Sequence, residues 1–454
     1  MAGLNTGSDT YFGWMEGDPV DWDNPTPAPL PDFTDMPHDP ASVQEAIEPS
    51  FSTQARGSQA EHGRTNEIAI TASIPFDWRH QGFEKPVQNV FEIVSNTEVA
   101  AIVVTSANNK IDFKESDLGT ELTASIPVGT YSTATLAAAA KAAVDAELSG
   151  GDTSTFTYVR HASKWTISST GDYLLLLWHS GSNADESARV HFGFTDEDQG
   201  DDESPISITS DGTVSILQDN VFELPEDLDL PQPNGMTWYQ HLNKYTNLLW
   251  NVFVNVMSWA VNANFLKFTM GINAGRVTEA EDSPIAYVPY AERPAVVKGY
   301  MSVTIDDTAN GGLLYENVRT KSLTINVPSP VAMEFADHAT YAVDAARTDK
   351  IKPEVSFSWF LNDRTTMDEA LQDRYRSGTP ISMTVTITSP IPFSSGHYKR
   401  TVFHFPSLIR KGASPNVTGP GPIEQPYSFI AQLGYGETTA MRLTLRNAKY
   451  IAIP

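Results

Sequence analysis

The sequence predicts a mainly β protein with minor α content: a β-sandwich or flattened barrel with one packed helix, a small inserted α/β module and an extended N-terminal arm. From residue 285 onward, apolar and polar residues alternate in short segments separated by Gly, Pro, Asn and Asp, which is typical of strands. Two stretches, 132–148 and 365–377, instead carry apolar residues at helical spacing. Residues 1–55 contain no Lys or Arg and are dense in Pro and Asp. These three observations define the expected architecture.

Residues 1–60 are expected to form an extended, acidic, Pro-rich arm. Its composition is too poor in core-forming residues for it to fold alone. Aromatic residues nevertheless recur along it, which indicates docking; we favour docking on neighbouring subunits over docking on the chain's own domains. We predict assembly contacts for four of them: Tyr11, Trp14, Trp22 and Phe33.

Residues 61–117 read as the first part of a β domain, and residues 118–210 as an α/β module inserted into it. In the module, Ser132 or Thr133 can cap a helix, and Gly150-Gly151 can follow its end. A hairpin and a further strand are expected after the helix, and then a strand that runs from Val190 into an acidic loop. The expected apolar stripe of the helix is Leu136, Ala140, Ala143, Val144 and Leu148.

Residues 211–283 complete the first β domain, but the pattern of 236–271 is ambiguous. Asn247, Asn251 and Asn255 recur at helical spacing, while β-branched residues alternate with them as in a strand. We favour a long strand for 249–260.

Residues 284–454 predict a β domain of seven to nine strands with one helix packed outside it. That helix, 365–377, has acidic residues in its first turn and ends before Gly378. Its expected inner stripe is Met367, Ala370, Leu371 and Tyr375.

Composition excludes several functions. The chain has a net charge of −26, and residues 1–283 hold 13 basic against 41 acidic groups, so a role in gripping nucleic acid is disfavoured. It has no cysteine, which excludes disulfides, thiolate metal sites and a cysteine nucleophile. No apolar stretch is long enough for a transmembrane helix, and no signal peptide is visible. We therefore expect no membrane association.

No motif argues for catalysis, so we expect a protein that is not an enzyme and needs no cofactor or metal. His179 and Ser180 are adjacent, but neighbours on a strand point to opposite faces. The acidic residues Asp196, Asp198 and Asp202 do not match a calcium loop, so we expect an exposed, solvated acidic loop.

The C-terminal half resembles the tail tube proteins of long-tailed, siphovirus-like viruses of bacteria or archaea. The resemblance is carried by "YVPYAERPAVVKGYMSVTID", the single helix 365–377, "TPISMTVTITS", "FHFPSLIRKG" and the closing "YSFIAQLGY…MRLTLRNA". The module around 126–148, between "NNKIDFKE" and "VHFGFTDED", is similar to a small module in structural proteins of such viruses. The acidic arm departs from a minimal tube protein.

The resemblance implies a virion structural protein whose copies assemble edge to edge into rings, and rings into a hollow conduit for genome delivery. Its partners would be itself, other tail or capsid proteins and DNA in transient passage. It would be assembled in the host cytoplasm and reside in the virion tail. The inserted module would decorate the outer wall. If residues 65–117 and 211–283 form a first copy of the tube fold, threefold rings become possible; a single copy favours sixfold rings.

Two alternatives remain open at the level of sequence. One is a capsid-decorating or baseplate protein of the virion. The other is a surface- or carbohydrate-binding protein of adhesin type, acting through aromatic residues such as Trp165 and Trp178.

Overall fold

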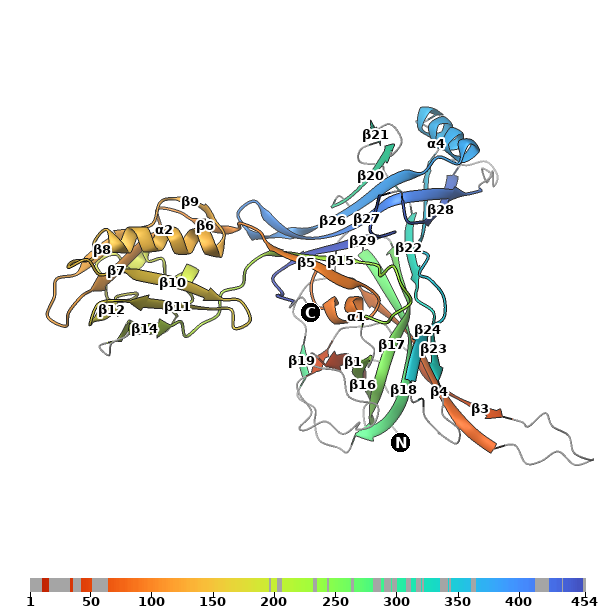
Figure 1. The fold of residues 1–454 in the computed structure, drawn as a ribbon, viewed down its shortest axis with the longest axis horizontal. Helices are drawn as coiled ribbons and strands as arrows, with labels where there is room; N and C mark the ends of the chain where they lie inside the picture. The colour runs from red at the N-terminus through yellow and green to blue at the C-terminus, as the bar shows by residue number, and fades with distance from the viewer. Residues whose placement is uncertain are drawn as a thin grey trace, which may run out of the picture. The chain divides into compact units, whose positions relative to one another are not determined.

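The protein is mainly β, as predicted (Figure 1). Its described part also contains four α-helices. The chain divides into two compact units. Unit 1 comprises Met1–Val94, Val221–Pro390 and Arg400–Thr444, and unit 2 comprises Ser95–Asn220, Ile391–Lys399 and Leu445–Pro454. The computed structural model describes residues 10–15, 33–35, 42–50, 64–195, 197–201, 206–231, 235–242, 245–262, 265–280, 287–289, 295, 300–307, 312–315, 320, 322–334, 342, 344–360, 365–412, 424–434 and 436–451.

The main feature of unit 1 is a ladder of antiparallel strands in the order β3–β4–β18–β17–β22–β25–β28–β27. These strands are β3 (Ser42–Ser50), β4 (Arg64–Asp77), β18 (Phe265–Ala280), β17 (Tyr245–Asn262), β22 (Ser322–Pro328), β25 (Glu354–Phe360), β28 (Glu424–Ala431) and β27 (His397–Lys411).

Further strands extend the sheet beyond β27. Strand β29 pairs with β27 and β15, β15 pairs with β5, and β20 pairs with β26 and β21. Their bounds are β5 (Glu92–Glu98), β15 (Gln218–Glu223), β20 (Met301–Asp307), β21 (Gly312–Tyr315), β26 (Ile381–Ser394) and β29 (Arg442–Asn447). A separate hairpin consists of β23 (Val331–Glu334) and β24 (Asp344–Arg347).

An aromatic core explains why these strands hold together. Alternate residues of the ladder face inward, so that Phe76, Phe268, Trp259 and Ile325 lie in one transverse row and are fully buried. Trp259 also contacts Phe403 of β27, with 5.2 Å between ring centroids. The core thus joins strands far apart in the ladder, as in a β-sandwich.

A short helix, α1 (Glu84–Gln88), covers part of this core and was not predicted. Phe83, which precedes it, stacks on Trp78 with 4.7 Å between ring centroids, and Val87 is fully buried. Five residues are too few to show a helical period in the sequence.

The segment whose pattern was ambiguous forms a strand, β17 (Tyr245–Asn262), as favoured. Along one edge it pairs with β18 throughout. Along the other, it pairs with β16 (Met236–Leu242) up to Val252 and with β22 from Val256 onward. The change of partner falls where the strand is irregular: Asn251 has a φ of 52°, and the register with β18 shifts between Val254 and Val256.

Asparagine residues stabilise the irregular part of β17. Asn251 tolerates left-handed backbone better than other residues with a side chain. The Nδ2 of Asn255 donates to Asn273 Oδ1 at 2.8 Å, and Asn273 Nδ2 donates to the carbonyl of Val331 at 2.8 Å. The Oδ1 of Asn89 accepts from the backbone N–H of Val254 at 2.6 Å. The helix-like spacing of the asparagines therefore marks a break in a strand.

We expect Asn251→Val to destabilise unit 1 by about 1–3 kcal/mol, because a β-branched residue is strained at positive φ. Asn251→Gly is the matched control and should cost less, since glycine adopts this conformation freely. Urea unfolding of both variants measures the difference. A valine variant as stable as the glycine variant would contradict this explanation of the break.

The described parts of the predicted arm are strands paired with the chain itself. Strand β1 (Thr10–Met15) pairs with β16 and with β2 (Phe33–Asp35), and β2 runs parallel to β19 (Tyr287–Pro289). Strand β3 pairs with β4. Of the two docking modes considered, these segments thus use the chain's own strands, the mode that was not favoured; the arm as a separate domain stays a prediction.

Unit 2 contains an α/β body around the alanine-rich helix, α2 (Thr133–Asp145). Ser132 caps this helix in a capping box with Thr135, and its buried positions include Leu136, Ala140 and Val144. Ala143 and Leu148, the other predicted stripe residues, pack on the same core while half-buried.

The strands of this body form three small sheets. One has the order β10–β11–β14, a second β13–β12–β7–β8, and the third pairs β6 with β9. Their bounds are β6 (Ile102–Val104), β7 (Lys110–Lys114), β8 (Leu122–Ser125), β9 (Gly129–Tyr131), β10 (Ser154–Val159), β11 (Lys164–Ser169), β12 (Leu174–Leu176), β13 (Gln199–Asp201) and β14 (Ile206–Thr209).

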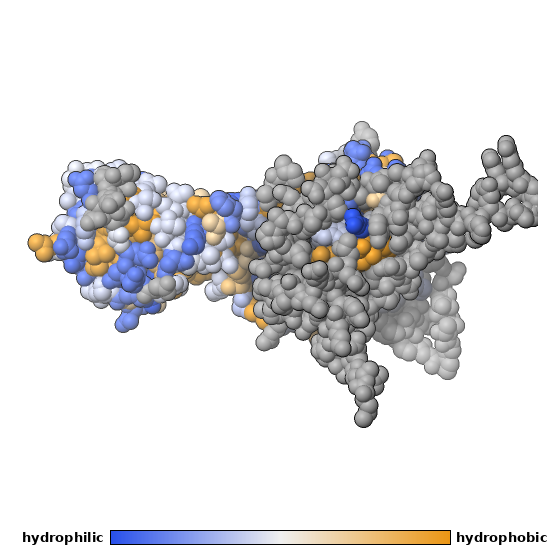
Figure 2. Space-filling view, turned by 90° about the horizontal axis from the view of Figure 1, so that it is seen from below, coloured by the Kyte–Doolittle hydropathy of each residue, from blue (hydrophilic) through white to orange (hydrophobic). Residues whose placement is uncertain are grey.

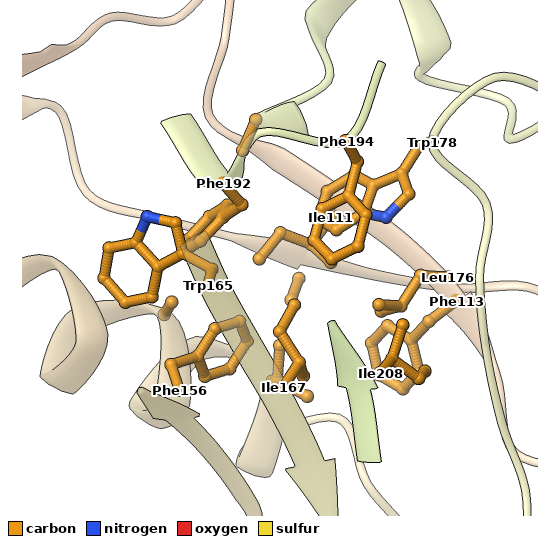
Figure 3. Packing of buried hydrophobic residues seen from close by; sticks show 14 of the residues in the cluster. Ile111, Phe113, Phe156, Trp165, Ile167, Leu176, Trp178, Phe192, Phe194 and Ile208 are labelled. Atoms are coloured by element: carbon orange, nitrogen blue, oxygen red, sulfur yellow. The ribbon is translucent and has the colours of Figure 1, made fainter. Parts of the chain in front are cut away.

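Aromatic residues fill the core of the α/β body (Figure 3). Trp178 stacks on Phe194 with 4.9 Å between ring centroids, and Trp165 meets Phe192 edge to face at 5.1 Å. The core also contains Val104, which the sequence analysis placed in the preceding β domain. The predicted boundary at residue 118 stays a prediction.

One element of the module was predicted wrongly. The segment from Val190 was expected to be a strand, but a short helix, α3 (Arg189–Phe192), begins there and follows a 3-10 turn, η2 (Ala184–Glu186). Gly193, at a φ of 72°, ends the helix, and Phe194 donates its N–H back to the carbonyl of Arg189 at 3.2 Å. A helix of four residues is too short to show a helical period in the sequence, so its residues can be read as the alternating pattern of a strand.

Candidate functional site: the polar face of the large sheet

The ladder of unit 1 has a second face, opposite the aromatic core, on which polar residues predominate. One transverse row of directly paired residues crosses seven strands, and none of its members is buried. We define the polar face by this row: Asp77, Lys267, Ala260, Thr324, Ser356, Ser428 and Lys411.

The neighbouring row continues the same character. It includes Thr269, Ser258, Asn326 and Glu354, each the direct partner of the next. This pattern follows from the period of a strand: the buried Phe268, for instance, lies between Lys267 and Thr269. A single alternation in the sequence thus builds the core on one side and the polar face on the other.

The charges on the polar face are paired. Lys267 Nζ lies 2.9 Å from Asp77 Oδ1, and Lys411 forms an ion pair with Glu354. Hydroxyls and amides supply most of the remaining surface of these two rows. Within the two rows the two lysines therefore face two carboxylates, and the surface they form offers no surplus of positive charge to a polyanion.

Arginines beside β15 are paired in the same way. Arg446 makes a two-point contact with Asp219, in which Nε donates to Oδ1 at 2.7 Å. Arg442 Nε donates to Glu223 Oε1 at 2.7 Å. Two-point guanidinium–carboxylate contacts are strong and directional, so these cations are held by the protein itself.

Helix α4 (Thr365–Ser377) is attached to the sheet through Arg410. The Arg410 guanidinium lies over the Tyr427 ring at 4.6 Å and the Tyr375 ring at 5.5 Å, and it donates to Gln372 Oε1 at 2.9 Å. Leu371 is buried, as predicted. Tyr375 is 42% exposed, and for Met367 and Ala370, the other residues of the predicted stripe, the structure describes only the backbone.

The predicted assembly residues of the arm are only partly described. Tyr11 and Trp14 lie in β1 and Phe33 in β2, where Trp14 pairs directly with Trp238 of β16 and Phe33 with Met15. Trp22 lies outside the described residues. Their assembly role stays a prediction.

Of the three residues of the predicted acidic loop, the structure describes Asp198. Asp198 is half-buried and accepts hydrogen bonds from the backbone N–H of His179 at 2.7 Å and from Ser180. Burial alone would raise the pKa of Asp198, but the hydrogen bonds from Ser180 and His179 outweigh it and hold that pKa below its ordinary value. Asp198 therefore orders the 179–180 turn. Asp196 and Asp202 lie outside the described residues.

The aromatic residues considered for carbohydrate binding are in the core. Trp165 and Trp178 are both 0% exposed, so neither can stack on a sugar at the surface. The exposed hydrophobic side chains of the α/β body include Leu118 and Val128. On the face drawn in Figure 2, the residues that are coloured show a mixture of hydrophobic and hydrophilic character. The adhesin alternative loses the residues on which it depended.

His404 lies in β27, where Thr384 Oγ1 is 3.0 Å from its Nδ1. Burial lowers the pKa of His404, and the nearby Arg442 lowers it further, against the opposing effect of Glu437 and Asp306. The unfolded chain therefore takes up a proton at a higher pH than the folded chain does.

We expect unit 1 to lose stability as the pH falls below about 6.5, the ordinary value for histidine, because protonation then favours the unfolded chain. His404→Gln should make the unfolding free energy less dependent on pH between 7 and 5. His161→Gln, at an exposed turn of unit 2, is the control. An unchanged pH dependence in the His404 variant would contradict this assignment.

The described residues contain no group of three His, Asp or Glu side chains that could hold a metal ion. In the same part of the chain, no helix has the length and apolar character needed to cross a membrane. The constellation that distinguishes unit 1 is the polar face, with its paired charges and hydroxyls.

A comparison with protein families bears on the role of the chain. A family model described as "Phage tail tube protein" matches residues 22–431, most of the chain. The chain belongs to the phage tail tube protein family. A search of curated proteins finds no match. The family makes the chain a structural component of the virion tail, and the matched residues 22–431 extend well beyond the C-terminal half from which the resemblance was drawn.

Proposed function

We propose that the chain is the tail tube subunit itself, which self-assembles into stacked rings that form a hollow conduit for genome delivery. The family supports a structural role in the tail. The polar face supports the conduit, because a channel for DNA needs a continuous surface that does not hold phosphates. Phosphate contacts by Lys and Arg bind DNA through counterion release and would stall its passage.

The polar face meets this requirement through pairing rather than through the absence of cations. Lys267 and Lys411 each lie against a carboxylate, and the serines and threonines between them carry no charge. The face spans seven strands of one sheet. Sheets of neighbouring subunits placed edge to edge would extend it around a ring and close their exposed edges. We assign the polar face to the channel wall.

The order of elements supports a duplicated tube fold. In the first half, β4, α1 and β5 occur in sequence, and β15 then pairs with β5. In the second half, β25, α4 and β26 occur in sequence, and β27 follows β26 after two residues. The α/β body lies between β5 and β15, where the second half has only the turn Ser395-Gly396. It would be an insertion that decorates the outer wall, and the duplicated fold would close a ring with threefold symmetry.

Negative-stain electron microscopy of the purified full chain at high concentration, in low and high salt, tests the proposal. We expect hollow tubes of stacked rings, and threefold rings if the fold is duplicated. Compact monomers or isolated rings under all conditions would instead favour a baseplate or capsid-decorating role within the virion.

A further inference from the structure

A pocket of about 370 Å³ lies in unit 1 at one end of the strands that carry the polar face. It opens where β25 begins and β28 ends, and its volume is within the range of about 300–1000 Å³ typical of ligand pockets. Its floor and walls are mainly apolar and include Leu224, Ile351, Ile430, Leu433 and Ala440.

Two lysines stand at the rim of this pocket. Lys350 is exposed and forms no ion pair with any residue that the structure describes, and Lys352 lies 3.2 Å from Asp349. Both members of that pair are more than half exposed, so the pair contributes about 0–1 kcal/mol and is readily exchanged. Glu226 is the acidic residue of the lining. An apolar side chain flanked by carboxylates matches the pocket.

One segment of the chain has this chemistry. Residues 16–32 read EGDPVDWDNPTPAPLPD: five acidic residues, no Lys or Arg, and a single aromatic residue, Trp22, placed between Asp21 and Asp23. The segment lies outside the described residues, but both of its ends are fixed. Met15 of β1 pairs directly with Phe33 of β2, so the segment leaves the sheet and returns to it at the same place.

In the sequence, 17 residues, five of them proline, separate the paired Met15 and Phe33, and Trp22 is the seventh of these residues. At up to about 3.3–3.6 Å per residue, this length of chain is sufficient for Trp22 to reach a neighbouring molecule.

We propose that the pocket where β25 begins and β28 ends receives Trp22 of a second copy of this chain, with Asp21 and Asp23 facing Lys350 and Lys352. The contact is head-to-tail, because pocket and segment are different parts of the surface, and such contacts generate rings or open stacks. The aromatic side chain supplies the buried anchor, and the flanking charges fix its orientation. The proposal rests on the self-assembly proposed above and names the residues that perform it.

A peptide experiment tests the contact without requiring tubes. The probe is a fluorescein-labelled peptide of residues 16–32, titrated with the full chain carrying Trp22→Ala so that its own segment does not compete. We expect saturable binding by fluorescence anisotropy. The Trp22→Ala peptide should bind roughly 30-fold more weakly, as for a buried aromatic anchor.

Charge reversal supplies the control. Lys350→Glu/Lys352→Glu in the protein should weaken binding of the native peptide roughly tenfold, and an Asp21→Lys/Asp23→Lys peptide should bind that variant better than the native peptide does. A lack of peptide binding, or equal binding of all peptides to both proteins, would overturn the proposal.

Mixing two variants distinguishes binding of the segment in the pocket of a second copy from binding in the pocket of its own chain. Trp22→Ala chains keep the pocket, and Lys350→Glu/Lys352→Glu chains keep the segment, so a mixture restores one intact contact per pair. Native mass spectrometry should show heterodimers in the mixture and fewer associated species in either variant alone. A mixture that behaves like its separate components would assign the segment to the chain's own pocket and refute the second copy. Tubes from the wild type without peptide binding would leave the proposed function standing and remove this contact.

Discussion

Replacing Trp259 with alanine is expected to lower the unfolding free energy of unit 1 by about 3–5 kcal/mol. Trp259 is fully buried and contacts Phe268 at 4.9 Å, Trp78 at 5.6 Å and Phe403 at 5.2 Å between ring centroids. These three partners come from β18, the segment before α1, and β27. Truncation therefore opens a cavity at the point where distant strands meet.

Two further variants make this prediction specific. Trp259→Phe keeps an aromatic ring and removes an indole N–H that has no hydrogen-bond partner among the described residues, so it should cost much less than alanine. Phe265→Ala, at a 41% exposed position of β18, should cost little. Urea unfolding followed by circular dichroism ranks the three variants. Equal losses for Trp259→Ala and Phe265→Ala would show that the aromatic core does not hold the sandwich together.

Adding cations to the polar face is expected to make assembled tubes retain DNA. Ser73 of β4 and Ser356 of β25 are both exposed on this face, and four strand-to-strand steps separate their strands in the ladder. Ser73→Arg/Ser356→Arg adds unpaired cations to a face whose two native lysines are each paired with a carboxylate. DNA should then co-sediment with the tubes at low salt. With roughly six to ten phosphate contacts, the affinity should fall by about 10³–10⁵ between 50 and 200 mM salt.

Ser73→Gln/Ser356→Gln is the matched control, because it adds bulk and hydrogen-bonding groups without charge. Tubes of this variant and of the wild type should leave DNA in the supernatant at either salt concentration. Retention by the glutamine variant, or passage of DNA unaffected by the arginines, would mean that the polar face does not line the channel.

Period-2 patterning predicted strands of unit 1 such as β4, β22 and β26 because each has one buried face, whereas β1, β2 and β3 lie in the segment that was expected to be an extended arm. The long strand β17 was recoverable from its β-branched residues even though its asparagines imitate a helical period. The structural role of those asparagines could not be predicted from the sequence. The left-handed backbone at residue 251 and the change of pairing partner from β16 to β22 are properties of the folded sheet. Likewise α1 and α3 are too short for any period to reveal them.

The polar face, too, could be predicted from the sequence only in part. Alternation predicts that Thr324 and Ser356 face away from the core, but not that they are neighbours, because register between strands distant in sequence is set by packing. The pairing of Lys267 with Asp77 depends on that register. Asp198 was singled out for its acidic surroundings, whereas its role follows from a turn nineteen residues earlier in the sequence.

The most direct test of the central claim, that the polar face lines a channel, uses the absence of cysteine from the chain. Ser356→Cys places a single thiol on the polar face, and Ala138→Cys places one on the exposed side of α2 in the α/β body. Each variant is treated, before and after tube assembly, with a maleimide coupled to a folded protein too wide to enter a DNA-sized channel. Our account predicts that assembly protects the thiol at position 356 and leaves the one at position 138 reactive. Equal reactivity at position 356 in tubes and in free subunits would contradict it.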